Sequence, residues 1–163
     1  MDFLRRLFFF IVLLLVQVLV LNRIQLFNCA TPLLYVYFTI TLPAGYPRWA
    51  ALLWSFAMGL GVDIFNNTPG VSAASMTLIG FIQPSLLQLF LPREAEENIK
   101  ASATALGWGK FFTLATILVL IFCITHFALE AFNFFNWLYL LECIGGCTVI
   151  TIIFILSLES LRK

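Results

Sequence analysis

Among the ionisable side chains in or beside the apolar runs of this sequence, five could form one polar cluster: Arg23, Asp63, His126, Glu130 and Glu142. Carboxylates and histidine are the residue types that bind metal ions and relay protons. Three acids and one histidine in separate runs match no known metal motif. The sequence also lacks a nucleophile motif, a phosphate loop and a dinucleotide fingerprint. We therefore predict a protein that is not an enzyme and has no cofactor, with a polar cluster of these five residues as an open alternative.

The four cysteines have the surroundings of structural thiols. Cys123, Cys143 and Cys147 lie inside apolar runs, and Cys29 borders one. A zinc site needs about four ligands, and His126 is the single histidine of the sequence. Thiols in an apolar membrane interior rarely meet an oxidant. We predict buried free thiols, with no metal and no disulfide.

Small residues recur every fourth position in the third apolar run, as Ala51, Ser55 and Gly59, and the series ends in Asp63. Residues four apart share one face of a helix, and small side chains there allow another helix to approach closely. We name this series the small-residue ridge. It predicts close packing inside one bundle, and the alternative is a docking face for a partner's transmembrane helix. A similar series follows later, at Ala101, Ala105, Gly109 and Thr113.

Asp63 is the most informative single residue, because a carboxylate near a membrane is costly unless it is solvated or paired. It lies at the expected end of a helix, where the helix macrodipole disfavours an acid. Three interpretations follow: a solvated helix end, an ion pair with Arg23, or hydrogen bonds to backbone donors of the next turn. We hypothesise that Asp63 anchors the turn that leads through Gly70, whose missing side chain permits a positive φ.

The elements that position these residues are transmembrane helices. The 163 residues are 62% hydrophobic and 10% charged, which is too little charge to cover a water-facing surface. The expected spans are residues 4–21, 32–42, 49–65, 71–91, 110–127 and 137–158. The second is short for a bilayer core of about 30 Å. We predict a single transmembrane domain over residues 1–163, an all-α bundle of six helices.

The basic residues predict the orientation of this bundle. With six spans, eight lysine and arginine side chains fall on the side of the two termini and only Arg23 falls on the other. An excess of lysine and arginine marks cytoplasmic loops, so both termini are expected in the cytoplasm. A net charge of +1 does not suggest a nucleic-acid partner. The expected surroundings are membrane lipid and other membrane helices.

The third helix and the start of the fourth resemble a known family. The sequence Gly59-Leu60-Gly61-Val62-Asp63, followed by Gly70-Val71-Ser72-Ala73-Ala74, is similar to the signature of the MreD family of bacterial rod shape-determining membrane proteins. In that family a glycine-containing helix ends in an aspartate, and a short loop with a glycine leads to a small-residue helix start. The matching positions are Gly59, Asp63, Gly70 and Ala73.

The resemblance implies a non-enzymatic scaffold or adaptor of the peptidoglycan elongation machinery in the bacterial inner membrane. Its implied partners are an MreC-like protein, an MreB-like filament, and a RodA-type polymerase with its transpeptidase. The implied fold is similar to the six-helix substrate-binding subunits of energy-coupling vitamin transporters. A vitamin-type transporter subunit is therefore the alternative function, and it would need a polar pocket open to the outside.

Overall fold

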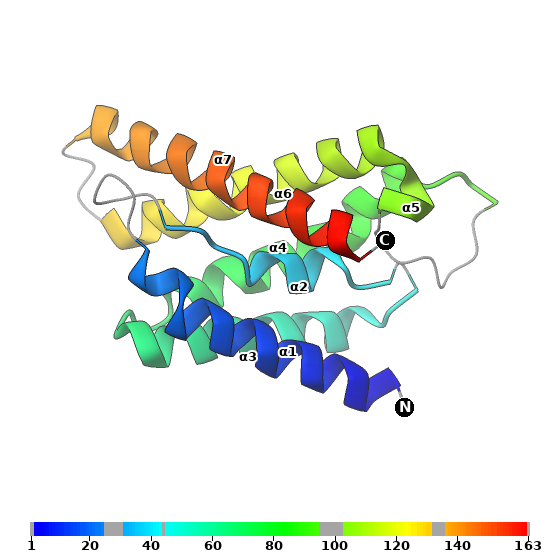
Figure 1. Ribbon diagram of the computed structural model, residues 1–163, viewed down its shortest axis with the longest axis horizontal. Coiled ribbons are helices and arrows are strands. Elements are labelled where there is room, and N and C mark those ends of the chain that lie inside the picture. The colour runs from blue at the N-terminus through cyan, green and yellow to red at the C-terminus, as the bar shows by residue number, and fades with distance from the viewer. Residues whose placement is uncertain (1, 25–30, 44, 95–102, 132–135, 163) are drawn as a thin grey trace.

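The computed structural model describes residues 2–24, 31–43, 45–94, 103–131 and 136–162, and its regular elements are helices (Figure 1). Five of them are long and apolar enough to cross a membrane. They are α1 (Asp2–Leu19), α3 (Arg48–Asn66), α4 (Val71–Phe90), α6 (Trp108–Ala131) and α7 (Trp137–Leu161). The short helices are η1 (Leu21–Arg23), α2 (Val36–Ile40) and α5 (Ala103–Leu106). The predicted helical membrane fold is thereby confirmed at this level.

The second expected span differs from the prediction. Residues 31–43, which we name the central segment, contain only the five-residue helix α2, with turns and irregular backbone on either side. Pro32 and Pro43 bound the apolar run, and most residues between them are aromatic or β-branched. Such side chains lose rotamer freedom in a helix, which lowers helix propensity. Five helices of spanning length, and not six, are present in the described part of the chain.

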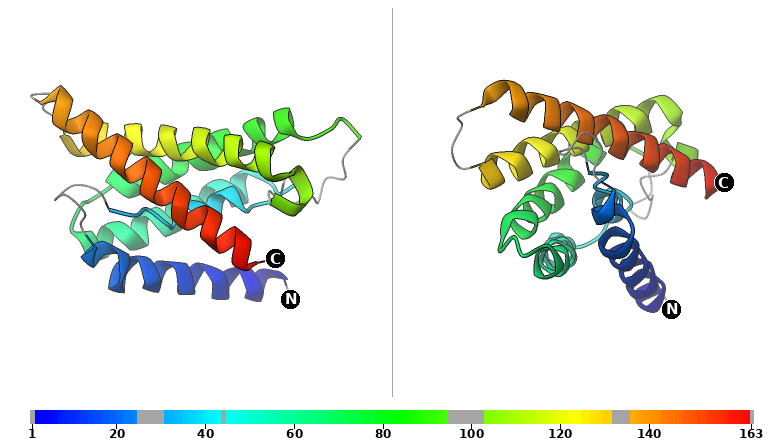
Figure 2. Two further views of the ribbon diagram at one scale, coloured as in Figure 1. Left: turned by 45° about the horizontal axis from the view of Figure 1, so that its top comes forward. Right: turned by 60° about the vertical axis from the view of Figure 1, so that its left-hand side comes forward.

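The long helices surround the central segment (Figures 1 and 2). In order of contact, α1 packs on α3, α3 on α4, α4 on α6, and α6 on α7, while α2 contacts α1, α3, α4 and α6. Figure 1 shows the central segment between the lower pair α1 and α3 and the upper pair α6 and α7, and shows both chain ends at one end of the bundle. Side chains of the central segment therefore form the middle of the core.

The outward faces of the long helices are apolar. Phe8, Trp49, Leu89, Ile124 and Val149 are exposed examples, one from each long helix. A soluble protein rarely exposes large contiguous apolar areas, whereas lipid tails are a suitable solvent for them. This surface agrees with a multi-pass membrane protein.

The first half of the central segment is bonded by polar side chains of α1 and α7. Gln17 of α1 accepts from the Leu34 N–H at 2.9 Å and donates to the Pro32 carbonyl at 3.0 Å. Thr151 of α7 accepts from the Leu33 N–H at 3.1 Å. These donors and acceptors replace the helical hydrogen bonds that irregular backbone lacks. Non-helical backbone at membrane depth is tolerated where protein buries and satisfies it.

The second half is bonded by polar side chains of α3 and α4. The Gln83 amide of α4 donates to the carbonyls of Ile40 and Leu42, at 3.3 and 3.2 Å. The hydroxyls of Thr39 and Ser55 lie 3.1 Å apart. Gln83, Thr39 and Ser55 are almost completely buried. Buried side chains of α1, α3, α4 and α7 thus bond the central segment along its length.

We predict that Gln83→Leu destabilises the fold because it leaves the Ile40 and Leu42 carbonyls buried without their amide donor. The expected loss is about 1–3 kcal/mol of unfolding free energy, measured by denaturant titration in detergent micelles. Gln88→Leu is the matched control, because Gln88 lies on the same helix and is exposed. Its expected effect is within about 0.5 kcal/mol. Equal stability of the two variants would contradict the role given to Gln83.

Candidate functional site

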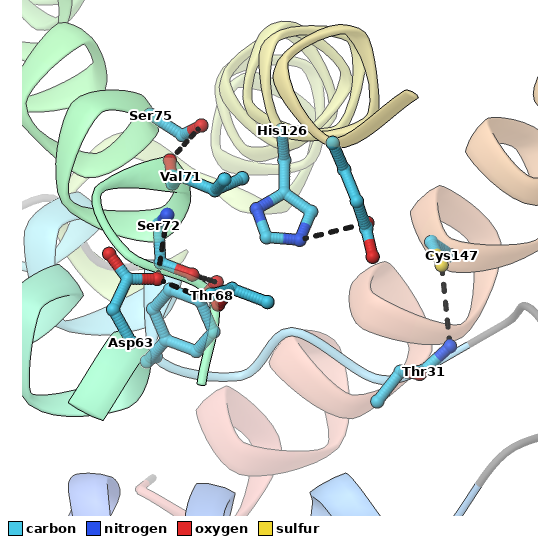
Figure 3. A network of polar contacts seen from close by, with 10 residues as sticks. Thr31, Asp63, Thr68, Val71, Ser72, Ser75, His126 and Cys147 are labelled. Carbon is cyan, nitrogen blue, oxygen red and sulfur yellow. Dashed lines mark hydrogen bonds and ion pairs between the residues drawn. The ribbon is translucent and has the colours of Figure 1, made fainter. Parts of the chain in front are cut away.

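The Asp63 carboxylate joins the end of α3 to the start of α4. It is 3% exposed, and both of its oxygens accept hydrogen bonds. Oδ1 accepts from the Ser72 N–H at 2.9 Å and from the Thr68 hydroxyl at 3.1 Å, and Oδ2 accepts from the Ala73 N–H at 3.0 Å (Figure 3). Asp63 therefore serves as the N-terminal cap of α4 from a different helix.

The α4 N-terminus needs this external cap because its N-cap residue is Gly70, which has no side chain. The first N–H groups of any helix lack intrahelical partners, and the positive end of the macrodipole there favours a carboxylate. Asn67 and Gly70 both take positive φ, 57° and 85°, which turns the chain sharply between the helices. The hypothesised anchor is thus observed, with the α4 N-terminus as its partner. Arg23 and Asp63 form no ion pair in the part of the chain described.

The small-residue ridge fits against α4. A Cβ added to Gly59 would lie 2.5 Å from the Ser72 carbonyl oxygen and 2.6 Å from the Ala73 Cα. A Cβ added to Gly80 of α4 would lie 2.6 Å from the Ser55 Oγ. Such contacts bring the two backbones as close together as the small side chains permit. Gly59 therefore places α4 where its first N–H groups meet Asp63.

All four residues of the small-residue ridge are buried under α4. The ridge therefore packs inside the bundle, as the first of the two interpretations expected. The alternative, a partner's helix docked on this ridge, is wrong because α4 already occupies the face. In the second series, Ala105, Gly109 and Thr113 are exposed, and Ala101 lies outside the described residues.

The predicted polar cluster forms only in part. The His126 Nε2 lies 3.8 Å from the Glu130 Oε2, one turn apart on α6. The Asp63 carboxylate accepts hydrogen bonds from the first N–H groups of α4, and Arg23 and Glu142 are exposed. Over the described ranges, no three histidine, cysteine, aspartate or glutamate side chains gather as a metal site would require. The five residues do not make one site.

The cysteines within the described ranges match the prediction of buried thiols. Cys123, Cys143 and Cys147 are buried and form no disulfide with another described cysteine, and Cys29 lies outside the described residues. Cys147 accepts a hydrogen bond from the Thr31 N–H at 3.3 Å (Figure 3). This thiol therefore helps to satisfy the central segment.

Sequence reasoning missed a second buried carboxylate, Glu159 of α7. It is 4% exposed, and it accepts from the Tyr37 hydroxyl at 2.6 Å and from the Ala103 N–H at 2.8 Å. Glu159 thereby connects α7, the central segment and α5. An acid inside an apolar helix is by default a residue with a specific role, which was the available signal. Gln17 carried the same signal, because it is the one polar residue between Leu7 and Leu21.

No known protein family, no curated protein and no solved structure matches this chain. What indicates a function is therefore the residues and contacts of the structure itself. Their chemistry is that of structural anchors: each buried carboxylate or amide bonds backbone groups of another element.

We predict that Gly59→Leu prevents the close approach of α3 and α4, because no Cβ fits at that position without movement of the α4 backbone. Overpacking of this kind costs typically about 1–3 kcal/mol, and a shift of α4 would also break its bonds to Asp63. Gly109→Leu is the matched control, since a Cβ there meets nothing within 4 Å. The measurement is the unfolding free energy in micelles, and equal values for both variants would refute the packing role.

We predict that Asp63→Asn is milder than Asp63→Leu. Asparagine keeps one acceptor oxygen for the α4 N–H groups, whereas leucine keeps none. Hydrogen bonds to a charged acceptor are worth about 1.5–3 kcal/mol, so Asp63→Leu should lose at least that much stability. Arg23→Gln should leave stability unchanged, because Arg23 is exposed and unpaired with Asp63. A loss with Arg23→Gln that equals the loss with Asp63→Asn would point to an ion pair instead.

Proposed function

We propose that this protein is a non-enzymatic scaffold of the peptidoglycan elongation machinery, similar in role to the MreD family. The observation that supports this most is the joint placement of the residues that carry the resemblance. Gly59, Asp63, Gly70 and Ala73 lie in one structural unit, where Gly59 touches Ala73 and Asp63 bonds the helix that Gly70 begins. The motif is then a helix–helix junction, which is a structural role and not a chemical one.

We further propose that the chain crosses the bacterial cytoplasmic (inner) membrane six times, with both termini in the cytoplasm. The five long helices are five crossings, and the central segment is the sixth. Both termini lie at one end of the bundle, as six crossings require (Figure 1). Basic residues at helix ends on that side support the cytoplasmic assignment: Arg5, Arg6, Arg48, Arg93 and Arg162.

The proposed partners are an MreC-like protein, an MreB-like filament, and a RodA-type polymerase with its transpeptidase. Because α4 covers the small-residue ridge, partner helices and membrane lipid would contact the exposed apolar faces of the long helices. A rigid bundle suits an adaptor, since binding surfaces on a pre-organised scaffold lose less entropy on association.

Depletion of the protein in its host should convert rod-shaped cells to spheres, and a plasmid copy should restore the rods. An affinity-tagged copy should retain an MreC-like protein after detergent extraction. Gly109→Leu should restore rods at a normal protein level, whereas Gly59→Leu should fail because the helix junction is lost. Rods that persist when the protein is undetectable would overturn the proposal.

Binding assays separate this proposal from the alternative, a vitamin-type transporter subunit. Purified protein in nanodiscs would be incubated with labelled riboflavin, thiamine or biotin. A scaffold should show no saturable binding. Saturable binding, together with normal cell shape after depletion, would favour the transporter.

A further inference from the structure

Arg6 of α1 holds its guanidinium group over an aromatic ring of another element. The Arg6 Cζ lies 4.3 Å from the centre of the Tyr46 ring, in the turn that precedes α3. The Tyr46 hydroxyl accepts from the Trp54 indole N–H at 3.0 Å. The Trp54 ring in turn contacts Phe3 and Phe10 of α1, with ring centroids 5.6 and 5.5 Å apart. Contacts between α1 and α3 therefore determine where this cation lies.

Two further arginines lie beside this contact. Arg5 precedes Arg6 on α1, and Arg48 begins α3 two residues after Tyr46. Figure 1 shows the starts of both helices at the same end of the bundle. We name Arg5, Arg6 and Arg48 the arginine patch. None of the three forms an ion pair with a carboxylate of the described residues, and this includes Asp2 in the first turn of α1.

A guanidinium group that stacks on a ring can still bind an anion. Stacking uses the flat face of the group and leaves the N–H donors at its edge for hydrogen bonds. These donors form a planar fork that matches the oxygens of a phosphate group, two at a time. Three arginines without an acidic partner, at the ends of two transmembrane helices, therefore favour an anion with phosphate chemistry.

Two exposed apolar faces begin next to the arginine patch. The face of α1 starts with Leu4, Phe8 and Ile11, and the face of α3 starts with Trp49, Leu53 and Phe56. Spacings of four and three residues keep each set on one side of its helix. Leu4 is next to Arg5, and Trp49 is next to Arg48. A phospholipid has the same order of parts, with a charged head group at the membrane surface and acyl chains below it.

We propose that the arginine patch binds the head-group phosphate of an anionic phospholipid, whose acyl chains lie along the exposed apolar faces of α1 and α3. Tyr46 positions Arg6, and Arg5 and Arg48 add positive charge. An arginine near an anionic lipid surface contributes about fivefold to the affinity. The site needs only the membrane fold, so it can be present whether or not the protein is a scaffold.

The test is lipid binding, measured by native mass spectrometry of the purified protein in neutral detergent. The protein would be titrated with phosphatidylglycerol, which is anionic, or with phosphatidylcholine, which has no net charge. The wild-type protein should bind phosphatidylglycerol at least about tenfold more tightly, because more than one arginine contributes. Arg6→Gln and Arg48→Gln should each weaken this binding about fivefold and leave phosphatidylcholine binding unchanged.

Arg23→Gln is the matched control, since Arg23 is an exposed arginine beyond the opposite end of α1. It removes the same charge from the protein at a distance where salt screens its effect on the patch, so the affinity should change less than about twofold. A loss with Arg23→Gln that equals the loss with Arg6→Gln would mean that net charge alone attracts the lipid, and it would overturn the proposal.

Two variants of Tyr46 separate a positioned site from net charge, because both keep every arginine. Both lose the hydroxyl that accepts from Trp54, but only Tyr46→Phe keeps the ring under Arg6. Tyr46→Leu should weaken phosphatidylglycerol binding about two- to fivefold, the factor that corresponds to an exposed cation–π contact. Tyr46→Phe should bind like the wild-type protein. Equal affinities of these two variants would contradict the role of the ring.

The source of the phosphate is tested by competition. Soluble glycerol phosphate in excess over the lipid should not displace phosphatidylglycerol, because it has no acyl chains to place on the apolar faces. Displacement would overturn the lipid as the occupant. Equal affinity of the wild-type protein for the two lipids would also overturn the proposal, and would leave an acidic protein segment as the partner of the arginine patch.

Discussion

The arrangement of the helices depends on one requirement. The irregular backbone of the central segment must be hydrogen-bonded by side chains of the surrounding helices. Inside an apolar bundle no water replaces missing helical bonds, and each unsatisfied polar group costs several kcal/mol. Gln17 and Thr151 bond one half of the segment, and Gln83 bonds the other. These side chains belong to α1, α7 and α4, so the segment sets where those helices stand relative to one another. The few polar residues of these apolar helices are explained by this requirement.

Two buried carboxylates apply the same principle toward opposite ends of the bundle. Asp63 bonds the first N–H groups of α4, and Glu159 bonds the Ala103 N–H at the start of α5. A tyrosine of the central segment reaches each region, because Tyr35 donates to the Ser72 hydroxyl and Tyr37 to Glu159. Desolvation of a carboxylate is repaid only when several donors converge on it. Glu159 therefore joins α7, the central segment and α5 directly, whereas Asp63 joins α3 to α4.

The α3–α4 junction combines packing and electrostatics in one place. Gly59 allows the α4 backbone to approach, and the approach brings the Ser72 and Ala73 N–H groups to Asp63. A larger residue at Gly59 would separate the very atoms that the carboxylate bonds. The two positions are therefore coupled, and their effects on stability should not be additive. This coupling gives a physical reason why a short motif can include both a helical glycine and an aspartate four residues later.

The sequence by itself determined the five long helices, the turn through Gly70 and the buried state of the described thiols, because each follows from local composition and spacing. It also indicated Asp63 as a hydrogen-bond acceptor, since its turn is only a few residues away. Only the tertiary structure decided that α4 covers the small-residue ridge, and that the central segment is irregular. The hydrogen-bond partners of Glu159, Gln17 and Gln83 are likewise evident only from the tertiary structure. Their bonds join residues up to 122 positions apart, and no local pattern encodes which surface meets which. Long-range packing selected the partners, and burial made each of those hydrogen bonds obligatory.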